Sequence, residues 1–390
     1  MLRLQFSRLT PAICGLLALT QIGCATSSGG GSLAPAQMEA LMHSHGVDQA
    51  VVPYAPSAEM VAWARSQVSP TVEDSRRLEI LAERLLSERG RGMKYRRDAT
   101  VTAVEAFARG EANCLSFTHL FVGLARSLGV PVRFLEIRDL ERYDKTDDLI
   151  VHSDHIAVGY GPRHQMMIID FAAEQGLQYR EIAELTDVEA TAMYYSNRGA
   201  EALQRDELST ALSWLGDAVR FAPDLAAPWV NFGVARRRSG DFEAAEAAYR
   251  RALELDVAEF SAYQNLAALL RMTGRADEAY DLLTVTDASK NRNPYTFLAL
   301  GDLSRRNGRL DEAERFYRRA IRVQREDAEA LAAMGDLALE QDDLDAARRW
   351  LRKARKIDPQ DERVLELEAA LRTATKQLSA AGMSRSAPGR

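Results

Sequence analysis

The sequence predicts an α+β domain followed by an all-α solenoid of repeated helix pairs. Two observations lead to this division. In the first half, stretches with helical spacing of apolar residues give way, after residue 131, to short runs rich in strand-forming residues. In the second half, small residues recur every 34 positions, which is typical of a repeat array. A chain of 390 residues has room for both parts.

The first half predicts helices followed by a small antiparallel sheet. Apolar periodicity indicates helices over residues 34–46, 57–68, 72–90, 100–109 and 115–128. Runs of β-forming residues indicate strands over residues 132–137, 155–160 and 166–171. Gly129 is a suitable stop for the last helix. Helices that are segregated from an antiparallel sheet in this way are typical of the α+β class.

The second half repeats with a period of 34 residues. A small residue stands at the same place in each unit: Gly199, Gly233, Ala267, Gly301 and Gly335. Each unit is expected to be a pair of helices that buries its apolar face against the next unit, and small residues let the two helices approach closely. The pattern resembles the tetratricopeptide repeat and predicts five repeats over 191–361, a capping helix over 362–378 and a flexible tail over 379–390.

The resemblance implies a surface that binds a peptide or a partner protein. An intramolecular brace is the alternative role for the repeats. The net charge of −6 gives no footprint for nucleic acid. His43 and His45 lie two residues apart without further ligands nearby, so no metal and no cofactor are expected.

The N-terminus resembles a bacterial lipoprotein signal. A basic start is followed by an apolar stretch over 9–23, and Cys24 stands before a run of Gly and Ser. Gln21 departs from the pattern, which usually has an aliphatic residue there. The resemblance implies a signal peptide over 1–23, lipidation of Cys24, a tether over 24–33 and a periplasm-facing place in the cell envelope. An ordinary cleaved signal or an uncleaved anchor is the alternative.

Cys114 is the first candidate for chemistry. It is expected to be the free thiol of the mature chain, because Cys14 lies in the apolar leader and Cys24 is expected to carry lipid. It stands where a helix is expected to begin, and the N–H groups and dipole there favour a thiolate and can bind an oxyanion. Asn113 and Tyr95 are further oxyanion candidates. A buried core cysteine is the alternative.

A thiolate nucleophile also needs a histidine that is oriented by a third group. Two predicted strands flank a turn, and if that turn is centred on 162–163, His155 lies directly opposite Asp170. Side chains at such paired positions are close enough for an imidazole and a carboxylate to hydrogen-bond. His152 and Asp154 are weaker candidates, since alternation along the strand directs them to the other face.

The order of these residues resembles the transglutaminase-like core, whose papain-like triad runs Cys, His, Asp. Between Cys114 and His155 the chain has Leu-Gly-Val-Pro-Val-Arg over 128–133, and Asp170 follows Ile-Ile. The resemblance is to a bacterial subgroup in which this domain precedes tetratricopeptide repeats. It implies a domain over 34–190 with Cys114 as nucleophile, His155 as base and Asp170 as orienting acid.

The same resemblance implies an exported cysteine acyl-transfer enzyme that hydrolyses peptide or isopeptide bonds, with the repeats docking a polypeptide. Transfer to an amine is the other possible outcome for the acyl group. Many relatives carry His-Ala-Trp where this chain has Ile156 and Ala157 after the histidine, which leaves the substrate open. His119 is expected to pack, because it shares a helix with Cys114. The alternative function is a non-catalytic scaffold lipoprotein with a degenerate domain.

Overall fold

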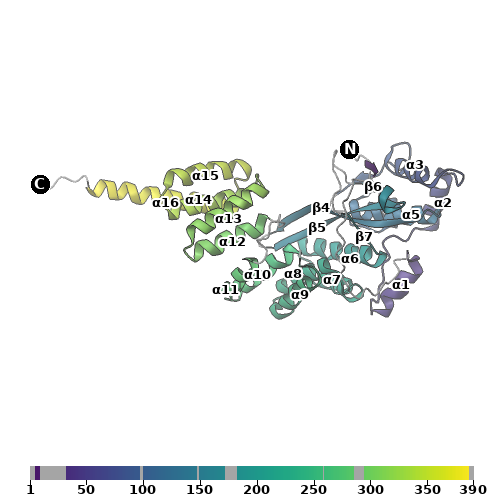
Figure 1. Cartoon of the computed structure of the whole chain (residues 1–390), viewed down its shortest axis with the longest axis horizontal. Coiled ribbons are helices and arrows are strands. Elements are labelled where there is room, and N and C mark those ends of the chain that lie inside the picture. Colours follow the sequence, from purple (N-terminus) through teal and green to yellow (C-terminus); the bar gives the residue numbers. More distant parts are fainter. Residues whose placement is uncertain are drawn as a thin grey trace, which may run out of the picture. The chain divides into compact units, whose positions relative to one another are not determined.

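A computed structural model describes residues 5–8, 32–96, 100–146, 149–171, 182–257, 259–284 and 294–385. It confirms the predicted class, with a mixed α/β region followed by a helical repeat region (Figure 1). The chain divides into two compact units, Met1–Arg251 and Ala252–Arg390. This division lies inside the repeat region, whereas the predicted domain boundary lies between residues 190 and 191.

The helices of the first half form close to where the sequence predicts them. They are α1 (Pro35–Ser44), α2 (Ala58–Gln67), α3 (Asp74–Leu86), α4 (Ala103–Arg109) and α5 (Cys114–Ser127). Hydroxyl caps explain two of the starts, since Ser57 accepts from the amide of Met60 and Thr102 accepts from the amide of Glu105.

A five-stranded sheet has the order β1-β6-β5-β4-β7, and every neighbouring pair is antiparallel. Its strands are β1 (Gln5–Arg8), β4 (Val132–Thr146), β5 (Leu149–Tyr160), β6 (Met167–Asp170) and β7 (Ile182–Leu185). The three predicted strands are present, and two of them are longer than predicted. Strand β1 lies within the predicted leader. A separate parallel pair joins β2 (Lys94–Tyr95) to β3 (Glu111–Ala112).

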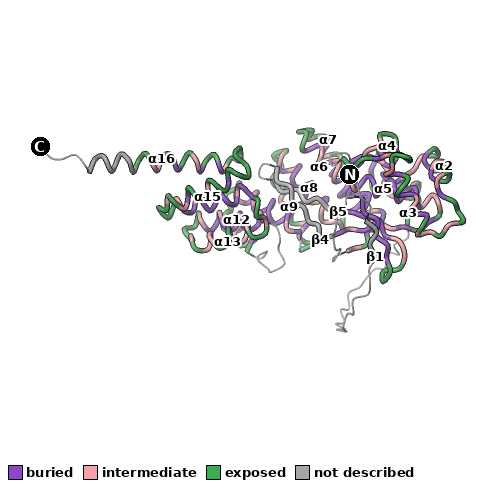
Figure 2. The backbone as a smooth tube through the Cα atoms, turned by 90° about the horizontal axis from the view of Figure 1, so that it is seen from above, coloured by how far each residue is buried: buried purple, intermediate pink, exposed green. Residues whose placement is uncertain are grey.

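Helix α5 is the buried centre of the first unit. Residues 115–125 are all buried, as Figure 2 shows. The Thr118 hydroxyl donates to the carbonyl of Ile156 over 3.3 Å, and the ring of Phe117 stacks on Phe171 at 5.3 Å. On another side of the helix, a Cβ on Gly123 would lie 2.1 Å from the carbonyl oxygen of Tyr54, so this contact requires glycine. These contacts fix the helix against the sheet.

The first repeat belongs to the same core. It consists of α6 (Asp187–Gln204) and α7 (Leu208–Phe221), and α8 (Ala226–Arg238) and α9 (Phe242–Leu255) follow. Tyr194 and Tyr195 of α6 are buried in one apolar cluster with residues of α1 to α5. The Tyr195 hydroxyl accepts from the amide of Val51 over 2.7 Å. Within the repeat, a Cβ on Gly199 would lie 2.4 Å from Leu215, which explains the small residue at this recurring position.

The second unit continues the helix pairs. It contains α10 (Phe260–Met272), α11 (Ala276–Thr284), α12 (Pro294–Arg306), α13 (Leu310–Val323), α14 (Ala328–Glu340), α15 (Leu344–Ile357) and α16 (Glu362–Arg385). The last helix extends seven residues beyond the predicted capping helix, into the predicted tail, since it ends at Arg385.

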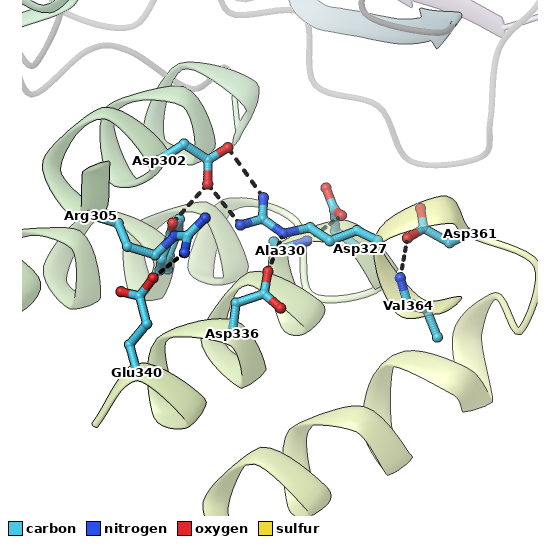
Figure 3. A network of polar contacts seen from close by, with 10 residues as sticks. Asp302, Arg305, Asp327, Ala330, Asp336, Glu340, Asp361 and Val364 are labelled. Carbon is cyan, nitrogen blue, oxygen red and sulfur yellow. Dashed lines mark hydrogen bonds and ion pairs between the residues drawn. The ribbon is translucent and has the colours of Figure 1, made fainter. Parts of the chain in front are cut away.

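A partly buried charge network joins α12, α14 and α16. The Arg363 guanidinium donates to Asp302 over 2.7 and 3.2 Å and to Asp336 over 2.9 Å, while the Tyr317 hydroxyl donates to Asp302 (Figure 3). Burial disfavours the Asp302 carboxylate, but Arg363 outweighs this and holds the pKa of Asp302 below its usual value. The network therefore links three helices at the end of the array through paired, partly buried charges.

Candidate active site

Cys114 is the first residue of α5 and is partly exposed. Asn113 caps this helix, and its side-chain oxygen accepts from the amide of Ser116 over 2.9 Å. At the first two positions of a helix, the amides of Cys114 and Leu115 have no acceptor in the helix's own hydrogen-bond ladder. The sulfur therefore stands beside N–H groups at the positive end of the helix dipole.

His155 connects the thiol to a buried carboxylate. Its Nε2 donates to Oδ2 of Asp170 over 2.8 Å, and the Asp170 side chain is fully buried while that of His155 is 12% exposed. This bond leaves Nδ1 as the ring nitrogen for Cys114, with which His155 also hydrogen-bonds. A thiol, an imidazole and a carboxylate thus form one hydrogen-bonded chain, which is the arrangement of an activated nucleophile.

The charge on His155 is set by these two partners. Burial by itself would lower the pKa of His155. The hydrogen bonds and the negative charges of Asp170 and Cys114 outweigh burial and raise this pKa to about 10. An imidazolium that persists at neutral pH holds a proton that a leaving group can take.

The strand register corrects the predicted turn. Tyr160 pairs with Met167 and Val158 pairs with Ile169, so paired residue numbers sum to 327 rather than the predicted 325. The reason is a 3-10 turn, η1 (Arg163–Gln165), which moves the centre of the connection by one residue. His155 is therefore not directly opposite Asp170. A shift of two in the sum preserves the face of each side chain, and the imidazole reaches the carboxylate diagonally.

Family models match three stretches of the chain. Residues 62–154, which include Cys114, match the transglutaminase-like superfamily, and residues 230–292 and 304–371 match tetratricopeptide repeat models. The chain carries a transglutaminase-like domain followed by tetratricopeptide repeats. No curated protein matches the chain.

Solved structures resemble about half of the chain. The protein pilF of Pseudomonas aeruginosa has 21% identity and a TM-score of 0.44, and the match covers 50% of this chain and 89% of pilF. MamA from Desulfovibrio magneticus RS-1 has 20% identity and a TM-score of 0.36, covering 44% and 97%. A thermophilic tetratricopeptide repeat protein of Thermus thermophilus has 18% identity and a TM-score of 0.40, covering 46% and 98%. Because these TM-scores lie below 0.5, the assignment rests on the family models.

The two oxyanion candidates of the transglutaminase-like domain are Asn113 and Tyr95. The side chain of Asn113 is engaged at both ends, by Ser116 and by Thr100, so the structure does not direct its amide at a substrate. This corrects the expectation for Asn113. Tyr95 lies on β2 and is 39% exposed. It pairs with Ala112, which stands two residues before Cys114 in the chain, and its role as a donor stays a prediction.

The other predicted residues lie away from this chain of contacts or outside the described part. His119 packs as expected: it is fully buried, its Nε2 donates to the carbonyl of Ala190, and burial lowers its pKa to about 3. The side chains of His152 and Asp154 lie outside the described residues, as does Cys24. Among the described residues, no group of three or more His, Cys, Asp or Glu is arranged to hold a metal ion.

Two polar residues beside the site carry no signal in the sequence. The Ser116 hydroxyl accepts from the buried amide of Val101 over 2.8 Å, and the Thr100 hydroxyl accepts from Asn113 over 2.7 Å. The sequence predicts Thr100 as the start of a helix, whereas α4 begins after Thr102. No sequence pattern links Thr100 to Asn113, because the contact forms only when the chain before α4 folds back onto α5.

Proposed function

We propose that this protein is an exported cysteine acyl-transfer enzyme that acts on amide bonds of polypeptides. The observation that carries the proposal is the position of His155, which hydrogen-bonds both to Cys114 at a helix start and to the buried Asp170. A scaffold with a degenerate domain has no need to keep an imidazole between a thiol and a buried carboxylate.

The reaction follows from this arrangement. The Cys114 thiolate attacks the carbonyl carbon of an amide, and backbone N–H groups at the start of α5 bind the oxyanion that forms. The His155 imidazolium gives its proton to the leaving amine as the C–N bond breaks, and a thioester remains on the sulfur. His155 then takes a proton from water, whose oxygen attacks the thioester to release a carboxylic acid and the thiolate. Asp170 keeps the ring oriented throughout.

Hydrolysis is the outcome that we favour over cross-linking. Water is always present, whereas transfer to an amine requires a site that binds the amine, and the chain offers no residue pattern for one. An experiment with a peptide amide substrate and excess alkylamine distinguishes the two outcomes by mass spectrometry of the products. A dominant amide product would show that the thioester goes to amines.

The repeats support a role in protein interaction, and the polypeptide substrate or a partner is the proposed ligand. The leader sequence supports export and attachment through a lipid on Cys24, with the enzyme facing the periplasm. No described helix has the length and apolar character needed to cross a bilayer. Detergent partitioning of the wild type and of Cys24→Ala tests the anchor, since equal partitioning of the two proteins would refute it.

The test of the enzyme is labelling by an amide-based probe that reacts with activated thiols. Wild type should label rapidly, Cys114→Ala should not label, and His155→Ala should label at least about 100-fold more slowly, as expected for loss of a general base. The matched control is His45→Ala, because His45 is an exposed histidine at the end of α1. If His155→Ala labels at the wild-type rate, the thiol is not activated by this histidine and the scaffold function is favoured.

A further inference from the structure

The cap that starts α5 is itself held by residues from other elements. The side-chain amide of Asn113 donates to the Thr100 hydroxyl over 2.7 Å. The amide N–H of Thr100 donates to the Glu201 carboxylate over 3.1 Å, and the Thr100 side chain hydrogen-bonds to the same carboxylate. Glu201 lies on α6, the first helix of the first repeat. A continuous chain of hydrogen bonds thus runs from the repeat region to the residue before Cys114.

The link between Thr100 and Asn113 is buried, and the link between Thr100 and Glu201 is partly buried. Thr100 is 2% exposed and Asn113 is 5% exposed, so water cannot easily replace a lost partner. The Thr100 hydroxyl accepts a hydrogen bond from Asn113 and has one proton to donate, and the Glu201 carboxylate accepts that hydrogen bond. Arg198, one turn before Glu201 on α6, donates to the Thr100 carbonyl over 3.3 Å. Helix α6 therefore fixes the backbone and the hydroxyl of Thr100 together.

The position of the thiol depends on the conformation of Asn113. Its side-chain oxygen can cap Ser116 only if the amide group is turned the right way, and the bond to Thr100 selects that orientation. Without it, the amide can rotate, the cap weakens and the first turn of α5 can fray. Cys114 lies in this turn, so fraying moves its sulfur away from His155 and from the helix dipole.

We propose that Thr100 and Glu201 are positioning residues for Cys114, so that the first repeat is a working part of the active site and not only a docking module. The catalytic meaning of this inference rests on the proposed function. The arrangement explains why α6 packs into the core of the transglutaminase-like domain, while its Gly199 packs against the second helix of the repeat.

Two pairs of substitutions test the inference in the full-length chain. Thr100→Val removes the hydroxyl with little change of shape, whereas Thr100→Ser keeps it. Glu201→Leu removes the acceptor, whereas Glu201→Gln keeps one. The control is Thr102→Val. The Thr102 hydroxyl caps α4, as the Asn113 side chain caps α5, and it makes no contact with Asn113 among the described bonds.

The readout is the rate constant for alkylation of Cys114 by iodoacetamide between about pH 5 and pH 10, measured where each variant remains folded, with urea unfolding alongside. Thr100→Val and Glu201→Leu should react about fivefold more slowly at about pH 6, which corresponds to loss of a cap of about 1 kcal/mol. Thr100→Ser and Glu201→Gln should restore the rate. Thr102→Val should lower the urea midpoint and leave the profile of rate against pH unchanged.

The outcomes separate this inference from the proposed function. If Thr100→Val and Thr102→Val have the same pH profile, Thr100 stabilises the fold without positioning the thiol, and the inference is wrong. If Cys114 is alkylated at the same rate in His155→Ala as in the wild type, the proposed function is wrong, whatever the result for Thr100→Val. If His155 controls the rate and Thr100 does not, only the positioning role is lost.

Discussion

Replacement of Asp170 by asparagine should lower the pKa of the His155 imidazolium while it leaves the ring in place. The asparagine oxygen can still accept from Nε2 at the 2.8 Å distance of the native bond. The change therefore removes the negative charge and keeps the shape and the hydrogen bond. Burial of His155, which disfavours the charged ring, is then opposed mainly by Cys114.

The size of the effect follows from the contact. An opposite charge in direct contact shifts a pKa by about one to three units, and asparagine retains part of this effect because it still accepts the hydrogen bond. Loss of the charge should therefore lower the pKa of His155 by about one to two pH units. From a value of about 10 in the wild type, we expect a pKa of about 8–9 in Asp170→Asn.

The assay is a nitrogen NMR titration of protein that is labelled at histidine, because the ring-nitrogen shifts report protonation and tautomer together. Glu184→Gln is the control. Glu184 lies on β7 of the same sheet and pairs with Arg133 and Arg163, so this carboxylate-to-amide change should leave His155 unaltered. Cys114→Ala should also lower the pKa of His155, because the thiol is its other partner.

An unchanged titration in Asp170→Asn would refute the reasoning, since it would mean that the buried carboxylate does not stabilise the imidazolium. A changed tautomer would refute the claim that Nε2 faces Asp170 and Nδ1 faces Cys114. A fall that also occurs in Glu184→Gln would indicate a general effect of charge and not the contact at 2.8 Å.

Three further predictions concern stability. His155 has an ordinary pKa of 6.5 and a folded-state pKa of about 10. Its stabilising effect is therefore complete below pH 6.5 and is lost as pH rises towards 10. In urea titrations, the difference in unfolding free energy between wild type and His155→Gln should shrink across this range with a slope of up to about 1.4 kcal/mol per pH unit. Gly199→Ala should lower the free energy of unfolding by about 1–3 kcal/mol, because the added Cβ would collide with Leu215 of the next helix. Gly216→Ala should stabilise the protein slightly, because its added Cβ would meet nothing closer than 3.8 Å. Thermal unfolding distinguishes the two variants. Arg363→Ala should cost about 1–3 kcal/mol because it removes a guanidinium that pairs with two partly buried carboxylates, whereas Arg372→Ala, at an exposed pair, should change the urea midpoint little.

The helix pairs and the start of α5 could be predicted from the sequence because their signals are local. A spacing of 34 between small residues is visible without any knowledge of the fold. The break before Cys114 is also local, and the helix begins at that residue. The end of the last helix was less predictable, because the helix continues through Gly382, a residue that usually marks a helix end, as far as Arg385.

The sequence predicts the hydrogen bond between His155 and Asp170, but it does so from a register of β5 and β6 that differs from the observed one. Alternation along a strand fixes which face a residue takes, and this survives a shift of two in the register sum. The turn chemistry fixes the register itself, and the 3-10 turn at Arg163–Gln165 leaves no distinctive pattern in the sequence. The face was therefore predictable and the exact opposition was not.

The sequence by itself determined the two fold classes, the order of thiol, imidazole and carboxylate, and the helix on which the thiol lies. These depend on periodicity, on capping residues and on the face of each strand, all of which are properties of neighbours along the chain. Only the tertiary structure decided how Asn113 is held, because Thr100, 13 positions away, accepts from Asn113, and Glu201, 88 positions away, in turn accepts from Thr100. Contacts between distant segments depend on packing, and packing joined the first repeat to the site where the thiol lies.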